Sequence, residues 1–152
     1  MKLRIFIVTI SLLFSTLSLA QQTSTPLDTA LIRKLGADEY GQKNYVMGFL
    51  KRGPTKETDS TARDKIFHAH LQNIVRLMNE GKIVLAGPYL DDTDLRGVFV
   101  FNVATVDEAR QLCDTDPAVK GGYLIAEFHP WYGSAALQMI PEWHKKIQAK
   151  SF

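Results

Sequence analysis

The chain has 152 residues, of which 45% are hydrophobic and 22% charged, as in a globular domain with a buried core. Its formal net charge is +2, but two basic residues lie in the first twenty, so the remainder carries sixteen basic and sixteen acidic side chains. This balance argues against a nucleic-acid partner, which needs a basic patch, and gives no reason to expect a membrane-surface partner. Because Cys113 is the one cysteine, no internal disulfide can form.

Residues 1–20 have the layout of a secretory signal peptide. Two basic residues precede an apolar run over 5–19, and Ser18 and Ala20 supply the small residues expected before a cut at Gln21. The run is shorter than the roughly 20 residues of a membrane-spanning helix. We therefore expect a mature protein that is periplasmic or secreted and has no membrane attachment after cleavage.

An N-terminal arm over 21–43 separates this segment from the predicted domain. Thr29 to Leu35 predicts a short helix that Gly36 ends. Downstream, short runs of β-forming residues alternate with stretches in which apolar residues recur every 3.6 positions. Turn-forming residues separate these segments. These patterns predict a strand over 44–51, a helix over 61–80 that Gly81 ends, a strand over 82–87 and a strand over 96–103.

A capping box at Thr105 and Glu108 begins a second helix, which runs to Cys113. At the end of this helix Cys113 is best explained as a small buried hydrophobe rather than a nucleophile. A fourth strand follows over 123–128. The tail over 133–152 contains a second helical piece after Pro141.

The order strand, helix, strand, strand, helix, strand predicts an α+β fold of the ferredoxin-like, split βαβ type with an antiparallel sheet. Residues 98–101 are apolar at consecutive positions, so both faces of the sheet are expected to be buried, although two helices can cover only one. A homodimer that packs sheet against sheet would cover the second face. The aromatic residues of the tail are a competing cover.

One histidine lies on the apolar side of the first predicted helix. At 100° per residue, His70 falls between Leu77 and Ile74 inside the apolar stripe, whereas His68 falls on the polar side. The two histidines cannot jointly bind one metal, because helical ligands need a spacing of three or four residues. The acidic turn over 91–94 lacks the other ligands of a calcium loop and is interpreted as a solvated turn.

These features together resemble the YciI-like (YCII-related) family of dimeric α+β barrel proteins. The resemblance covers residues 44–132 and rests on His70-Leu71, Glu80-Gly81, Ala86-Gly87-Pro88 and Asp116-Pro117. It implies that His70 and Asp116 form a catalytic pair. One related branch is associated with dehydrochlorination of a hydroxylated aromatic, so the resemblance implies proton transfer on a small molecule. The N-terminal arm and the tail depart from the compact members.

Two functions follow from these residues. In the first, the chain is a small-molecule enzyme of the lyase or hydrolase type, without metal or cofactor, in which His70 transfers a proton and Asp116 orients its ring. In the second, it is a non-catalytic module that binds a small organic ligand or stabilises an assembly. His70 is then a core histidine bonded to a backbone carbonyl, and Asp116 caps one helical turn before Pro117. No nucleotide, redox or zinc motif is present.

The remaining polar candidates are better explained by surface positions. Tyr132, Arg96 and Glu127 could line a pocket, but each fits a strand face or a surface. His129 follows the fourth predicted strand and is expected to anchor an edge of the sheet. His144 lies beside two lysines in the tail and is expected to be solvated.

Overall fold

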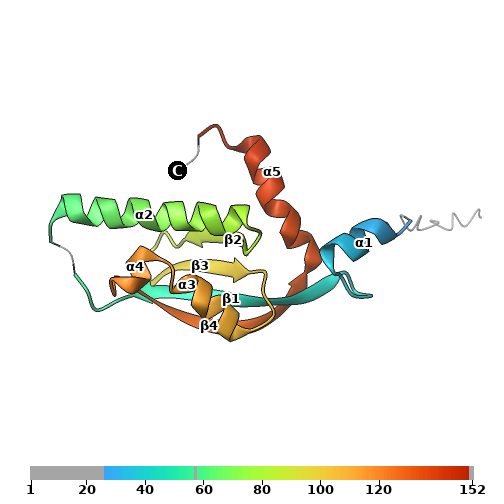
Figure 1. Ribbon diagram of the computed structural model, residues 1–152, viewed down its shortest axis with the longest axis horizontal. Coiled ribbons are helices and arrows are strands. Elements are labelled where there is room, and N and C mark those ends of the chain that lie inside the picture. Colours follow the sequence, from blue (N-terminus) through green and yellow to red (C-terminus); the bar gives the residue numbers. More distant parts are fainter. Residues whose placement is uncertain (1–25, 57, 151–152) are drawn as a thin grey trace, which may run out of the picture.

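A four-stranded antiparallel sheet forms the centre of the computed structural model, which describes residues 26–56 and 58–150 (Figure 1). The strand order is β2-β3-β1-β4. The predicted signal peptide lies outside the described residues. In chain order the elements are α1 (Thr29–Leu35), β1 (Gln42–Arg52), α2 (Ser60–Asn79), β2 (Ile83–Pro88), β3 (Leu95–Phe101), α3 (Val106–Cys113), α4 (Pro117–Lys120), β4 (Leu124–Ser134), η1 (Ala135–Met139) and α5 (Ile140–Ile147).

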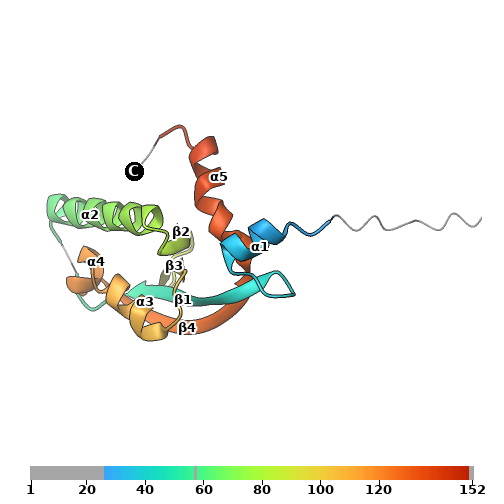
Figure 2. The same ribbon diagram turned by 45° about the vertical axis from the view of Figure 1, so that its right-hand side comes forward.

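This arrangement confirms the predicted α+β, ferredoxin-like fold. From β1 to β4 the elements follow the split βαβ order, with the single turn α4 inserted before the last strand. All three strand pairs are antiparallel. The helices α2, α3 and α4 lie on one side of the sheet, and α1 and α5 lie beyond the end where β1 begins (Figures 1 and 2).

Two strands are longer than the sequence predicted. β1 and β4 pair without interruption over eleven residues, from Gln42 opposite Ser134 to Arg52 opposite Leu124. His129 was expected to follow the fourth strand and instead lies within it. The strand continues through Pro130 because β4 is an edge strand, where a residue without an N–H can be placed facing away from its neighbour.

The helix ends follow local chemistry. The Asp59 carboxylate accepts from Thr61 N–H at 2.8 Å and begins α2. Gly81, with φ of 69°, takes the left-handed conformation after α2 and turns the chain into β2. Thr105 Oγ1 accepts from Glu108 N–H at 3.2 Å, which places the start of α3 at the predicted capping box.

The main core lies between the sheet and the helices α2, α3 and α4. Phe101 is fully buried at its centre and contacts Phe99 and Phe128 at ring-centroid distances of 5.6 and 6.1 Å. Gly48 of β1 makes room for this ring, because a Cβ there would lie 2.8 Å from Phe101 Cε2. The other buried apolar members include Val46, Leu50, Leu77, Ile83, Ala109, Cys113, Ala118 and Leu124.

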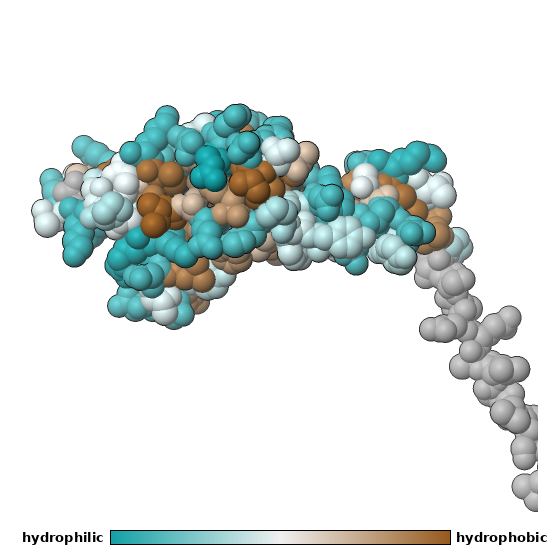
Figure 3. All heavy atoms as spheres, turned by 90° about the horizontal axis from the view of Figure 1, so that it is seen from below, coloured by the Kyte–Doolittle hydropathy of each residue, from teal (hydrophilic) through white to brown (hydrophobic). Residues whose placement is uncertain are grey.

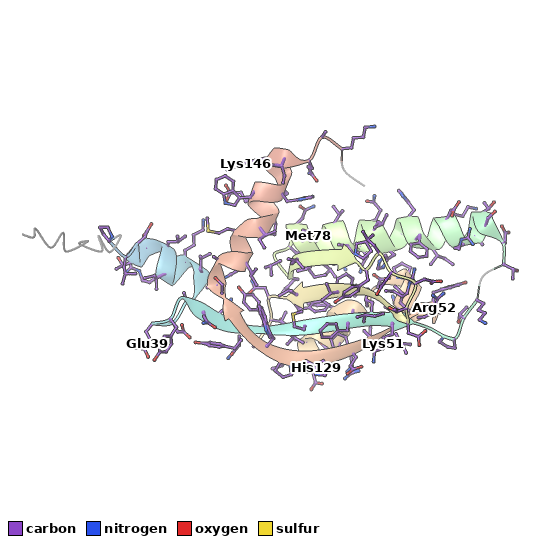
Figure 4. The ribbon with its side chains drawn as sticks, turned by 180° about the vertical axis from the view of Figure 1, so that it is seen from behind. Glu39, Lys51, Arg52, Met78, His129 and Lys146 are labelled. Atoms are coloured by element: carbon purple, nitrogen blue, oxygen red, sulfur yellow. The ribbon has the colours of Figure 1, made fainter. Side chains whose placement is uncertain are left out.

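The opposite face of the sheet is covered only in part. Tyr45, Val84 and Val100 form a second buried cluster, against which Leu137 of η1 packs. Farther along the same face, Phe49 and Val98 stay half-buried. Seen from behind in Figure 4, Lys51 and His129 mark the uncovered part of β1 and β4. The tail therefore covers one end of this face and leaves the rest open.

The end of the molecule formed by α1 and α5 carries exposed apolar side chains. Leu27, Trp143 and Ile147 are all more than half exposed. In the view of Figure 3 apolar surface alternates with hydrophilic surface and reappears at the end next to the grey trace. Among the described residues no helix combines the length and apolar character needed to cross a membrane.

Candidate functional site

His70 faces the sheet from the middle of α2, as its place in the apolar stripe predicted. It is 8% exposed and stacks on Phe99 of β3, with ring centroids 6.3 Å apart and planes at 30°. Phe67, one turn earlier on α2, meets the imidazole edge-on at 6.1 Å and is half exposed itself. The imidazole is thus held between two aromatic rings, one inside the core and one at the surface.

Asp116 lies in the turn between α3 and α4 and is 1% exposed. Its Oδ1 accepts from Ala118 N–H at 2.8 Å and caps α4, with Pro117 in the first turn. Its Oδ2 lies 2.7 Å from Nδ1 of His70. The predicted helix cap and the predicted contact with His70 are therefore both present, and each uses a different oxygen of one carboxylate.

This contact determines which ring nitrogen is free. A carboxylate accepts from an N–H, so the neutral imidazole carries its hydrogen on Nδ1 and its lone pair on Nε2. Nε2 has no hydrogen-bond partner among the described residues. In the same part of the chain no fully buried side-chain nitrogen or oxygen lacks a partner, so Nε2 must reach the solvent-accessible surface. The nitrogen that can exchange a proton with a ligand is Nε2.

Asn73 is a member of this site that the sequence analysis missed. It is buried, it lies three residues after His70 on the same side of α2, and its Nδ2 is 3.5 Å from Asp116 Oδ2. The spacing of three residues from His70 is the one signal that could have indicated it.

Cys113 lies close to the pair but is not a nucleophile. It is 1% exposed at the end of α3. Burial, reinforced by the negative charges of Asp116 and Asp114, raises the pKa of its thiol to about 12. The thiolate, which is the reactive form, is therefore absent at neutral pH.

The other polar candidates lie away from the pair, and all but the half-buried Arg96 are exposed. Glu127 pairs with Lys51 and accepts from His129 Nε2 at 2.8 Å on β4. Arg96 lies 3.7 Å from Asp92 in the acidic turn. The remaining two are also exposed: Tyr132 donates to Asp38 in the arm, and His144 lies on α5. Among the described residues no group of three or more His, Cys, Asp or Glu side chains could hold a metal ion.

Two surface hollows lie elsewhere in the described part of the chain. One is apolar and formed by η1 and α5, including Met139, Trp143 and Ile147. The other lies at the β4 edge beside Lys51 and Arg110. Neither is lined by His70 or Asp116, so the pocket expected at the pair is not one of these hollows.

Comparison with known proteins places the match on the sheet and its helices. The family model described as YCII-related domain matches residues 45–131. A similar solved structure is 5-chloro-2-hydroxyhydroquinone dehydrochlorinase from Burkholderia phenoliruptrix AC1100, in complex with 2,5-dihydroxybenzoquinone; the identity is 23%, the alignment covers 57% of this chain and 92% of that chain, and the TM-score is 0.41. A likeness at this level carries no inference about activity. Comparison with curated proteins finds no match.

Proposed function

The chain belongs to the YCII-related domain family, and on that premise we propose that it is an enzyme that transfers a proton on a small organic molecule. His70 is the acid–base group and Asp116 orients it. The observation that carries the proposal is the 2.7 Å contact between Nδ1 of His70 and a carboxylate that is 1% exposed. This contact leaves Nε2 as the reacting atom.

The chemistry follows from the tautomer. Neutral His70 takes a proton from the ligand at Nε2, and the imidazolium that forms is stabilised by the adjacent Asp116 carboxylate. In the reverse direction, the imidazolium returns the proton to the developing anion. A positioned acid–base group of this kind contributes about 10² to 10⁴ in rate.

The neighbourhood of His70 favours a ligand with an apolar part. A molecule that reaches Nε2 has the half-exposed ring of Phe67 beside it. An exposed aromatic ring next to an accessible polar atom can bind an apolar ligand and also orient its reacting group.

The second candidate is a non-catalytic module that binds a small ligand or stabilises an assembly. Its support is the burial of His70, which leaves 8% of the residue exposed, together with the absence of the pair from both surface hollows. In this function the imidazole is a polar contact that fixes α2 on α4.

A ligand screen separates the two candidates. We expect that small carboxylic acids and phenols found by thermal shift with the wild type are converted to product, detected by mass spectrometry. His70→Gln, which keeps a donor toward Asp116, should reduce turnover at least 100-fold, about the lower bound for a lost acid–base group. His68→Gln, two residues away on the exposed side of α2, is the matched control and should retain activity. Ligands that bind the wild type and His70→Gln equally and are never converted would favour the module.

We also propose that the protein is exported and acts in the periplasm or outside the cell. The support is the sequence of residues 1–20, with two basic residues, an apolar run and small residues before Gln21. Intact-mass measurement of protein from the periplasm of an expressing bacterium should find a chain that begins at Gln21. A chain that still begins at Met1 would contradict export and would indicate a cytoplasmic protein.

A further inference from the structure

The Asp116 oxygen that contacts His70 has a second neighbour. Nδ2 of Asn73 lies 3.5 Å from Asp116 Oδ2, the same atom that is 2.7 Å from Nδ1 of His70. Asn73 is 9% exposed, so its side chain is largely shielded from water. The carboxylate is thus contacted by a donor from each of two residues that lie one turn apart on α2.

The orientation of the Asn73 amide is determined by its other neighbours. Its Oδ1 accepts from Arg76 Nη2 at 2.8 Å, and Thr115 Oγ1 lies 3.1 Å away. An arginine offers only donors, so the amide oxygen must face Arg76 and the NH₂ group must face Asp116.

Arg76 and Thr115 are themselves fixed. The Arg76 guanidinium donates to both oxygens of Glu80, at 2.9 and 3.1 Å, and to Thr115 Oγ1 at 2.9 Å. Thr115 donates to Leu112 O at 2.7 Å. Thr115 directly precedes Asp116, so this chain of hydrogen bonds leads from the end of α2 to the turn that carries the carboxylate.

We propose that Asn73 is a positioning residue that holds the Asp116 carboxylate against Nδ1 of His70, with Arg76 keeping the Asn73 amide in the donating orientation. Without the Asn73 donor, Oδ2 loses one of the two groups that fix its place. The carboxylate can then turn away from the imidazole, and the hydrogen can move from Nδ1 to Nε2. In that tautomer Nε2 no longer accepts a proton. Only the catalytic consequence of this inference rests on the proposed function.

The tautomer of the His70 ring reports directly whether the Asp116 carboxylate is held against Nδ1. Its measurement needs no substrate. In long-range ¹H–¹⁵N spectra of the mature protein at about pH 8, we expect wild-type His70 to be almost entirely protonated on Nδ1. Asn73→Leu, which is close in size and cannot donate, should raise the Nε2-protonated share at least threefold. Asn79→Leu, at the exposed end of the same helix, is the matched control and should leave it unchanged.

A second variant covers the case in which Asn73→Leu does not fold. Arg76→Met leaves Asn73 in place but removes the donor that orients its amide, because a thioether side chain has no N–H, and it should shift the tautomers in the same direction. If each of these two variants that folds has the same tautomer ratio as the wild type, the inference is overturned. Failure of the proposed function has another signature: His70→Gln would match the wild type with every ligand, whatever the spectra show for Asn73.

Discussion

Three polar side chains, His70, Asn73 and Asp116, are buried at the boundary of an otherwise apolar core, and the first two both contact the Asp116 carboxylate. A buried polar group left without a partner costs about 1 to 3 kcal/mol, and more if it is charged. Truncating any one of the three therefore removes a hydrogen-bond partner from a buried neighbour. This is why His70→Gln, which retains a donor, is a better test of chemistry than His70→Ala.

The thiol of Cys113 provides a prediction at the same scale. Because burial raises its pKa to about 12, the folded state holds its proton at pH values where the unfolded chain has begun to release it. The contribution of the buried, protonated thiol to the free energy of unfolding is complete below about pH 9 and is lost as the pH rises toward 12. We expect the unfolding midpoint in urea to fall over this range, and to fall less in Cys113→Ala. A thiol reagent at pH 8 should label Cys113 only in denaturant, and rapid labelling of the native protein would contradict the assignment.

The sequence predicted His70 and Asp116 but not Asn73, for a physical reason. A histidine inside an apolar stripe requires a nearby acceptor, and Asp116 is a carboxylate placed at the end of the second helix. An asparagine on a helix carries no comparable signal. Its role depends on Arg76 and Thr115, which come from two elements that only the fold brings together.

At the scale of elements, the N-terminal arm is fixed to the end of the β1–β4 ladder. Gln138 Nε2 of η1 donates to Leu35 O at 2.6 Å, at the end of α1. The Tyr132 hydroxyl of β4 donates to the Asp38 carboxylate in the turn between α1 and β1. The arm is therefore held by the tail and by the last residues of β4, segments that are distant in the chain.

The Tyr132 hydroxyl lowers the pKa of Asp38, with Gln42 N–H adding to the effect, and this contact can be tested. In the folded state Asp38 stays ionised at pH values below its ordinary pKa of 3.8. The stabilisation that its carboxylate provides is therefore present above that pH and is lost as the pH falls further. We expect Tyr132→Phe to move the pKa of Asp38 upward in an NMR titration of its carboxyl carbon. Tyr40→Phe changes an exposed ring nearby and should leave the titration curve in place. Coincident curves for wild type and Tyr132→Phe would mean that the contact is absent in solution.

Element order was predictable from the sequence, while element length was less so. The helices α2 and α3 begin and end close to their predicted limits, because caps and Gly81 act locally. The extension of β4 through Pro130 depends on pairing with β1, which is about eighty residues away in the chain. The spacing of apolar residues and the positions of turn-forming residues carry no information about which distant strands pair.

At the scale of the whole molecule, the uncovered sheet face supports the predicted homodimer as a proposal. The structure separates two neighbouring residues of β3: Phe99 packs in the helix-side core, whereas Val98 faces away from the helices and is half-buried beside Phe49. η1 covers only the end of this face near Tyr45. A second copy would cover the remainder with one self-complementary surface.

Val98→Asp tests this assembly. We expect the wild type to be a dimer by light scattering at micromolar concentration and Val98→Asp to be a folded monomer, because the charge would be buried only in the dimer. Phe99→Asp places the same charge in the core of each subunit and should unfold the chain. If the wild type is monomeric over the whole concentration range, the homodimer is excluded, and the tail is the segment that covers this sheet face.

The two oxygens of Asp116 have a consequence for any mutational scan of this protein. One oxygen begins α4 and the other contacts His70, so a substitution at this position changes folding and function together. Loss of the cap alone costs about 1 kcal/mol. The coupling also works in reverse: a ligand or proton that tightens the contact with His70 holds the first turn of α4 in place. Slower amide exchange at Ala118 would then report occupancy of the site, without any assay for a product.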